Sequence, residues 1–149
     1  MTRTTFLPAF HISVVSGQMA VRTALGQLLD GLKPLSLDVE EAGTVELVMA
    51  EALNNIVEHA YPEDQDSGPI NITCAHASDG LHLTVVDSGR AMPDGQTPVG
   101  GAADIDVDFC DMPEGGFGWF LIKDLAKDVT YQRQDTENQL QLRLAVALA

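Results

Sequence analysis

The amino-acid sequence predicts an α+β fold, a two-layer sandwich in which helices cover one face of a mostly antiparallel sheet. The first observation is the order of expected elements: strand, helix, helix, strand, strand, long loop, helix, strand, strand. Strands joined by short turns pair as antiparallel hairpins, and helices then stack on one face of the sheet. The second observation is that the chain lacks an alternating strand–helix–strand pattern and a glycine-rich turn after its first strand. A Rossmann fold is therefore disfavoured.

The N-terminal region predicts one strand and one helix. Alternating apolar positions and β-branched residues predict a strand from Phe6 to Val15. Ser16 is expected to cap a helix that continues to about Leu32, because Gly31 and Pro34 are residues that end helices.

A longer helix is predicted next. Asp38 followed by Glu41 is the pattern of a capping box, in which each side chain accepts a hydrogen bond from the other residue's backbone. The helix is expected to continue to about His59. Tyr61 then precedes Pro62, and a residue before proline avoids the helical conformation.

The second half of the chain predicts a hairpin, a long loop, a helix and a second hairpin. Residues 70–75 and 81–87 alternate with a period of two around a turn at 78–80. No pattern continues from 88 to 116, and loops of this length are typical of lids and binding loops. The remaining elements are a helix at 117–126 and strands at 129–133 and 140–148, with a turn at 135–138 between these strands.

Length and composition indicate a single soluble domain. The 149 residues fit a single domain spanning 1–149. No apolar run approaches the roughly 18 residues that span a bilayer, and the first six residues do not resemble a signal peptide. A soluble cytoplasmic protein is therefore expected.

The cysteines do not indicate a metal site. Cys74 and Cys110 lack metal-ligand spacing, and Cys74 is expected in the core. His76 and His82 are expected on the exposed face of the first hairpin.

The net charge is -14, from 22 acidic residues against 8 Lys and Arg. Direct binding to nucleic acid is disfavoured, because neutralising phosphates needs a basic surface. An anionic membrane surface would repel the chain for the same reason. A protein partner with a basic patch would instead be attracted to it, although ordinary solubility explains the charge equally well.

The predicted long helix carries an unusual polar stripe. At 3.6 residues per turn, Glu51, Asn54, Asn55 and Glu58 fall on one face. Mg²⁺ prefers hard oxygen ligands, and the amide oxygen of Asn55 is one. A carboxylate one turn away, Glu51, could accept a proton from an attacking hydroxyl. A merely solvated polar face is the alternative.

Two glycine-containing motifs follow. Asp87 ends an apolar strand and could accept a hydrogen bond from an amino group such as that of adenine, while Gly89 would let a flat ring approach the backbone. An ordinary strand-to-loop turn is the alternative. Gly115-Gly116-Phe117-Gly118 opens a predicted helix, and helix N-termini bind phosphates. This cluster could also be only a hinge.

Together and in this order, the three motifs resemble the gyrase/histidine-kinase ATPase superfamily. The strings that carry the resemblance are ELVMAEALNNIVEHAYPE, LHLTVVDSG and GGFGWFLIKDLAKDVTY. Within the superfamily, the small size is most similar to the bacterial anti-sigma factor serine/threonine-protein kinases. The resemblance implies a histidine-kinase-like ATPase domain at 1–149, with an ATP-lid loop at about 88–115.

The resemblance also implies roles for individual residues. Asn55 matches the magnesium-binding asparagine, and Glu51 matches the carboxylate proposed as general base. Asp87 matches the adenine-binding aspartate, with Gly89 beside it. The glycines that match the phosphate-binding pair are Gly116 and Gly118.

The implied function is an ATP- and Mg²⁺-dependent serine/threonine kinase that phosphorylates a small anti-sigma antagonist and sequesters a sigma factor. A homodimer is expected from the family. Two departures from the family pattern favour an alternative, a non-catalytic protein-binding module of the same fold that uses nucleotide only structurally or not at all. Ala91 stands where the second glycine of the first box is usual, and no Lys or Arg occurs from Ala91 through Ile122. A plain acidic scaffold is the third interpretation.

Overall fold

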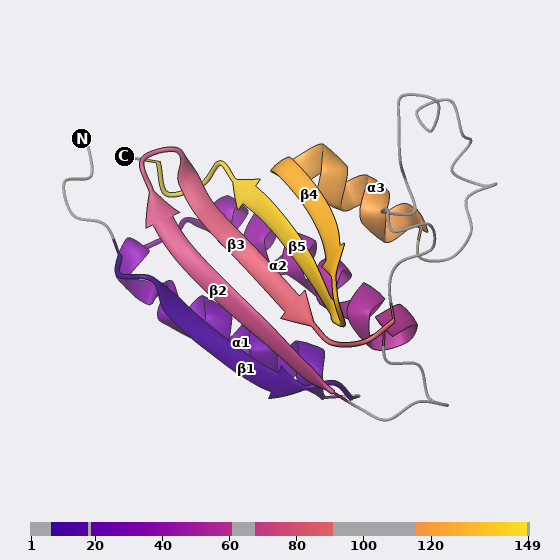
Figure 1. Ribbon diagram of the computed structural model, residues 1–149. Coiled ribbons are helices and arrows are strands. Elements are labelled where there is room, and N and C mark those ends of the chain that lie inside the picture. Colours follow the sequence, from indigo (N-terminus) through magenta and orange to yellow (C-terminus); the bar gives the residue numbers. More distant parts are fainter. Residues whose placement is uncertain (1–6, 18, 61–67, 91–115, 149) are drawn as a thin grey trace.

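The structure is a computed structural model that describes residues 7–17, 19–60, 68–90 and 116–148. Its elements follow the predicted order (Figure 1). They are β1 (Phe10–Val15), α1 (Ala20–Gly31), the 3-10 turn η1 (Lys33–Leu35), α2 (Val39–Asn55), the π-helical turn η2 (Ile56–Ala60), β2 (Pro69–Ala77), β3 (Gly80–Asp87), α3 (Gly116–Leu125), β4 (Lys127–Gln134) and β5 (Glu137–Leu144).

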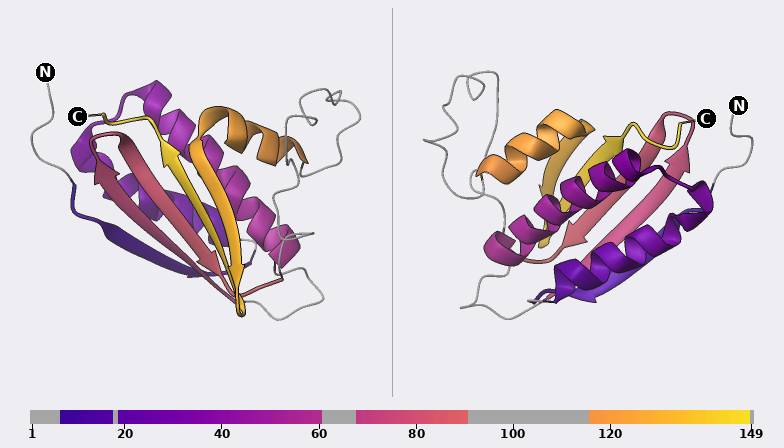
Figure 2. Two further views of the ribbon diagram at one scale, coloured as in Figure 1. Left: turned by 45° about the horizontal axis from the view of Figure 1, so that its top comes forward. Right: turned by 180° about the vertical axis from the view of Figure 1, so that it is seen from behind.

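The described strands form one sheet in the order β1-β2-β3-β5-β4, and every neighbouring pair is antiparallel. The helices α1, α2 and α3 all lie on the same face of this sheet (Figure 2). The predicted two-layer α+β sandwich is therefore confirmed. Because β5 lies between β3 and β4, Asp87 at the end of β3 is opposite Asn138 at the start of β5.

The core lies between the sheet and the helices. Every second residue of the central strands points into it, as the period of two predicts. On α2, the apolar positions that meet this face are spaced three and four residues apart. The fully buried side chains of the central strands and α2 include Ile70, Ile72, Leu81, Leu83, Val45, Met49 and Leu53.

Cys74 belongs to this core, as predicted. Its side chain is buried among apolar neighbours, and burial raises the pKa of the thiol to about 12. Cys74 therefore behaves as an apolar core residue rather than as a reactive thiol. Cys110 lies outside the described residues.

The predicted capping box at the start of α2 is confirmed. Oδ1 of Asp38 accepts a hydrogen bond from the backbone N–H of Glu41 at 2.7 Å, and the Asp38 N–H donates to Oε1 of Glu41 at 3.3 Å. The predicted cap on α1 is wrong, because that helix begins at Ala20 after Met19. Ser16 instead donates its backbone N–H to the carbonyl of Gly68 at 2.9 Å, which continues the pairing of β1 with β2.

The C-terminal hairpin also differs from its prediction. The turn contains only Asp135 and Thr136, and Asp135 adopts the left-handed conformation with φ of 55°. Asn138, predicted as a turn residue, is in β5, and its side chain is buried. Strand β5 ends at Leu144 rather than at Leu148.

His76 is buried on the core face of β2, so its predicted place on the exposed face is wrong. The ring is tolerated there because backbone groups satisfy both nitrogens. Nδ1 accepts a hydrogen bond from the Leu7 N–H at 3.0 Å, and Nε2 lies 2.8 Å from the carbonyl oxygen of Ala147. His82 is exposed, as predicted.

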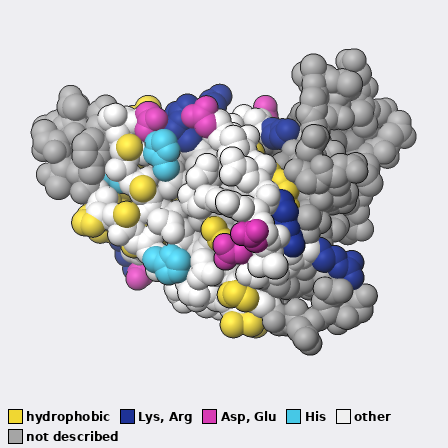
Figure 3. Space-filling view, viewed as in Figure 1, with side chains coloured by type: hydrophobic (Ala, Val, Ile, Leu, Met, Phe, Trp, Pro, Cys, Tyr) yellow, Lys and Arg dark blue, Asp and Glu magenta, His cyan; other side chains and the backbone are white. Residues whose placement is uncertain are grey.

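None of the helices among the described residues covers the other face of the sheet. Exposed side chains on it include Thr73, His82 and Gln141, and Figure 3 shows that uncharged side chains and backbone make up much of the described surface there. Within the described ranges, none of the helices combines the length and the apolar character that a bilayer crossing needs.

Candidate functional site

The segments that carry the predicted site residues lie on the same side of the molecule. The end of α2 is near the end of β3 in the ribbon views, and the first turn of α3 lies on that side too (Figures 1 and 2). Helix α3 also packs against α2. The fold thus brings together three motifs that are well separated in the sequence.

Asn55 occupies the last position of α2, and only 2% of it is exposed. Its Nδ2 donates to the backbone carbonyl of Glu51 at 2.7 Å. Its Oδ1 is buried and has no hydrogen-bond partner among the described residues. Leaving a buried acceptor unsatisfied costs about 1–3 kcal/mol, so such an atom is expected where a ligand or metal ion completes it.

Glu51 lies one turn before Asn55 and is partly exposed. Glu51 accepts the hydrogen bond from Asn55 with its backbone oxygen. The Glu51 carboxylate makes no hydrogen bond or ion pair to any described residue. The pair therefore places a carboxylate and an amide oxygen, neither of them bonded to another described residue, one helical turn apart.

The polar stripe predicted on this helix is only partly correct. Asn54 and Glu58 are exposed, whereas Asn55 faces inward and is buried. In addition, the helix changes to a π-helical turn at Ile56–Ala60, where each turn holds more residues than in an α-helix. Beyond Asn55 the α-helical spacing used for the prediction no longer applies. π-Helical turns inside helices are frequent at functional sites.

Asp87 ends β3, and 4% of it is exposed. Its Oδ1 accepts two hydrogen bonds, from the Gly89 N–H at 2.9 Å and from Nδ2 of Asn138 at 2.7 Å. Among the described residues, no bond reaches Oδ2. Burial raises the pKa of this carboxyl, and the bonds from Asn138 and Gly89 and the charge of Arg133 partly oppose the rise.

Asn138 was not among the predicted site residues. Besides its bond to Asp87, its Nδ2 donates to the carbonyl of Arg90 at 2.8 Å, while its Oδ1 accepts from the Tyr131 hydroxyl at 2.7 Å. One sequence signal could have found it. Asn138 shares the strand parity of Leu140, Leu142 and Leu144, so it is the polar residue in an inward-facing series.

Gly116 and Gly118 lie on the first turn of α3. The first turn of a helix has backbone N–H groups without partners in the helix, and these groups favour anions. Of the lid predicted at about 88–115, only residues 88–90 are described; Ala91 and Gly115 lie outside the described residues.

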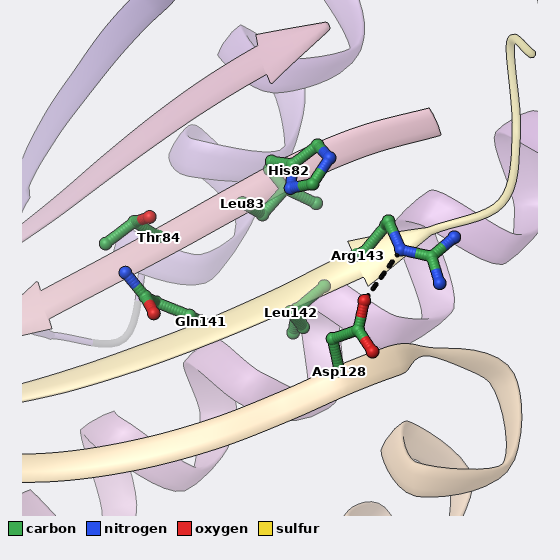
Figure 4. A pocket seen from close by; sticks show the side chains of 7 residues that line it. All are labelled: His82, Leu83, Thr84, Asp128, Gln141, Leu142 and Arg143. Carbon is green, nitrogen blue, oxygen red and sulfur yellow. Dashed lines mark hydrogen bonds and ion pairs between the residues drawn. The ribbon is translucent and has the colours of Figure 1, made fainter. Parts of the chain in front are cut away.

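A separate pocket of about 220 Å³ lies on the helix-free face of the sheet and contains none of the predicted site residues (Figure 4). Its most basic group, Arg143, is already engaged, because its Nε donates to Asp128 at 2.9 Å. The polar residues around it are His82, Thr84 and Gln141. The pocket therefore shares neither the residues nor the chemistry of the Asp87 region.

Comparison with known protein families matches residues 17–144 to the model described as the histidine kinase-like ATPase domain. The chain belongs to this family. The matched range includes every predicted site residue, and the family accounts for the sandwich fold. The resemblance expected from the motifs is confirmed.

Curated relatives of this ATPase domain are bacterial kinases. The chain is 33% identical over 99 residues to proteins named Serine-protein kinase RsbW from Staphylococcus aureus strains JH9 and Newman. The alignment covers 65% of this chain and 60% of each relative. The chain thus matches less than two thirds of the length of these relatives.

A solved structure has the same fold. It is the crystal structure of the RsbU and RsbW domains of Rv1364c from Mycobacterium tuberculosis, with a TM-score of 0.64 and 21% sequence identity. The match covers 93% of this chain and 32% of that one. It supports the histidine-kinase-like ATPase fold.

Proposed function

We propose that this ATPase domain is a Mg²⁺- and ATP-dependent serine/threonine kinase that phosphorylates a small anti-sigma antagonist protein and sequesters a sigma factor. The observation that carries the proposal is the buried Oδ1 of Asn55, one turn from the carboxylate of Glu51, since neither group bonds to another residue in the described part of the chain. The family and its curated relatives, which are named serine-protein kinases, support the reaction class.

The residues present fit a magnesium ion. Oδ1 of Asn55 is a neutral, hard oxygen ligand, and Mg²⁺ commonly takes few protein ligands besides water and substrate phosphates. A bound magnesium ion would supply charge neutralisation on the phosphates during transfer. We assign Asn55 as its protein ligand.

The remaining residues bind and orient the substrates. Asp87 accepts a hydrogen bond from the amino group of adenine through Oδ2, with Gly89 next to the ring. The N–H groups at Gly116 and Gly118 favour the phosphates. Glu51 takes the proton of the partner's seryl or threonyl hydroxyl as that oxygen bonds to the γ-phosphorus and the bond to ADP breaks.

A protein partner is consistent with the charge of the chain. At a net charge of -14, a basic surface on the antagonist or on the sigma factor would be attracted at long range. By family resemblance we also expect a homodimer in the cytoplasm.

A second candidate is a non-catalytic binding module of the same fold. The observation that favours it is the absence of Lys and Arg from Ala91 through Ile122, which leaves this stretch of the sequence without a cation for the γ-phosphate. In addition, Arg133 already uses its NH1 group on Gly89 and Asn138.

Two measurements on the purified chain separate these functions. Calorimetric titration with ATP and magnesium tests nucleotide binding, and transfer of labelled phosphate to an antagonist encoded beside the gene tests catalysis. Glu51→Gln is expected to reduce transfer at least about 100-fold, the usual range for a general base, while nucleotide affinity changes less than about twofold.

Glu46→Gln is the matched control, because Glu46 is an exposed carboxylate on the same helix. It is expected to leave both measurements unchanged. Normal transfer by the Glu51 variant would contradict the assigned base. Nucleotide binding without transfer by the wild-type chain would favour the non-catalytic module.

A further inference from the structure

Arg133 and Asn138 face each other across the β4–β5 hairpin. The Arg133 NH1 group donates to Oδ1 of Asn138 at 3.0 Å and to the carbonyl oxygen of Gly89 at 2.6 Å. The hydroxyl of Tyr131 also donates to Oδ1 of Asn138, at 2.7 Å. One arginine thus joins the hairpin to the residues that follow β3.

Arg133 is one of the groups that set which way the Asn138 amide points, together with Tyr131, Asp87 and the carbonyl of Arg90. A guanidinium group has only donors, so the amide oxygen of Asn138 must face it. The amide nitrogen consequently faces the end of β3, where it donates to Oδ1 of Asp87 at 2.7 Å and to the carbonyl of Arg90 at 2.8 Å. The orientation of this amide follows from its neighbours' chemistry.

The Asn138 amide also determines which carboxylate oxygen of Asp87 can accept a hydrogen bond from a ligand. Its Oδ1 receives two hydrogen bonds, from Asn138 and from the Gly89 N–H at 2.9 Å, and these hold the carboxylate in one rotation. Oδ2 is then the oxygen left to accept a bond from a ligand. Burial raises the pKa of Asp87, whereas the Asn138 bond and the Arg133 charge lower it and so favour the ionised, accepting form.

We propose that Arg133 and Asn138 are positioning residues for base selection, which hold Asp87 so that the site prefers a purine bearing an exocyclic amino group. Arg133 acts through Asn138, and Asn138 acts through Asp87. The proposal rests on the proposed nucleotide site. It assigns selectivity to a hairpin that the sequence motifs did not include.

Two purine nucleotides provide the test. Inosine diphosphate carries a carbonyl oxygen where adenine has its amino group, so its 6-position cannot donate to Oδ2 of Asp87. Calorimetric titrations with each nucleotide and magnesium would give the ratio of their affinities. For the wild-type chain we expect ADP to bind at least about tenfold more tightly, because one hydrogen bond to a charged group is worth about this much.

Arg133→Gln is the decisive variant, because residue 133 is exposed and glutamine can present either an oxygen or a nitrogen to Asn138. It is expected to weaken ADP binding and to reduce the preference to about threefold or less, with inosine diphosphate affinity nearly unchanged. Arg133→Lys keeps a pure donor and should retain most of the preference. Asn138→Ala should lose the preference as Arg133→Gln does.

Arg143→Gln is the matched control, since Arg143 is an arginine of the same hairpin whose bonds go to Asp128 and Asp79. It is expected to keep the wild-type ratio. If Arg133→Gln kept the wild-type ratio of the two affinities, the inference would be overturned. An equal loss of affinity for both nucleotides would also overturn it, because it would indicate a purely structural role. Failure of the wild-type chain to bind either nucleotide would overturn the nucleotide site itself, and the inference with it.

Discussion

The side-chain nitrogen of Asn55 donates to the backbone carbonyl of Glu51 at 2.7 Å, and Oδ1 of Asn55 is buried without a hydrogen-bond partner among the described residues. The helix itself therefore orients the amide. No other described side chain holds it.

Asn55→Ala is expected to remove the dependence of nucleotide binding on magnesium. In the wild-type chain, chelating magnesium should weaken ADP binding at least about tenfold, or about 1.4 kcal/mol, whereas the variant should bind weakly with or without the metal. Unfolding free energy should fall by less than about 2 kcal/mol, because the substitution also removes an unsatisfied acceptor. Calorimetry and urea unfolding measure the two effects.

Asn54→Ala is the control for this variant, since Asn54 is the adjacent amide but is exposed. It should bind nucleotide with the magnesium dependence of the wild-type chain. The assignment of Asn55 as metal ligand would be wrong if its alanine variant retained that dependence.

Asp87→Asn is expected to become more stable relative to the wild-type chain as pH rises. Burial raises the pKa of Asp87 above its ordinary 3.8, so the native state holds the proton more strongly than the unfolded state. The stability contributed by this carboxyl is therefore full below pH 3.8 and is lost as pH rises through the folded-state pKa.

Asparagine at position 87 does not titrate, yet its oxygen can still accept from Gly89 and Asn138. Urea unfolding of both proteins, measured between about pH 4 and 8, should show the difference growing in favour of the variant and then levelling off. A difference that stays constant with pH would contradict the raised pKa. The variant should also lose its preference for adenine.

Gly80→Ala is expected to destabilise the fold by at least about 2 kcal/mol. Gly80 has a φ of 124°, and an added Cβ would lie 2.1 Å from the carbonyl oxygen of Leu144. Both the backbone conformation and the backbone contact oppose a side chain there. The measurement is the urea midpoint.

Gly43→Ala is the opposite case and serves as the control. Gly43 is inside α2, and nothing lies within 4 Å of the position a Cβ would take. This change should stabilise the chain by about 0.5–1 kcal/mol through helix propensity. Equal effects of the two substitutions would show that the strain assigned to Gly80 is absent.

Glu41→Ala is expected to cost more than Asp38→Ala, which should cost about 1 kcal/mol as a lost helix cap. Oε1 of Glu41 completes the capping box, and its Oε2 accepts a hydrogen bond from the Ala147 N–H at 2.9 Å. Urea unfolding gives both costs. Amide exchange at Ala147 should accelerate in the Glu41 variant only, and Glu40→Ala, which changes an exposed neighbour, should not affect it.

Local patterns predicted most of the fold. The period of two in β2 and β3 and the capping box at Asp38 and Glu41 depend on residues close in sequence, so they can be recognised in one chain. Ser16 shows where this reasoning fails. Ser16 was predicted to cap α1, but its backbone N–H instead bonds to the carbonyl of Gly68. This contact joins residues far apart in the sequence, so a local motif cannot predict it.

The candidate site was predicted from three motifs, and the structure brings their segments together, but the role of each residue remains a prediction. The residue that the motifs missed, Asn138, contacts Asp87 across 51 positions, and the sheet order decides this pairing. Asn55 illustrates a different limit. A helical stripe indicates which residues share a face, but whether Asn55 is buried depends on the packing of neighbouring elements.

The sheet order β1-β2-β3-β5-β4 has a consequence for biosynthesis. A chain emerging from the ribosome presents Asp87 before the strand that completes its surroundings, because β5 follows α3 and β4 in the sequence. A nascent or truncated chain that stops before Asn138 has the helical residues Glu51 and Asn55 and yet cannot hold the carboxylate of Asp87 as the full chain does. Nucleotide binding at the proposed site should therefore arise only after β5 has been synthesised, which would make it an indicator that β3 and β5 have paired.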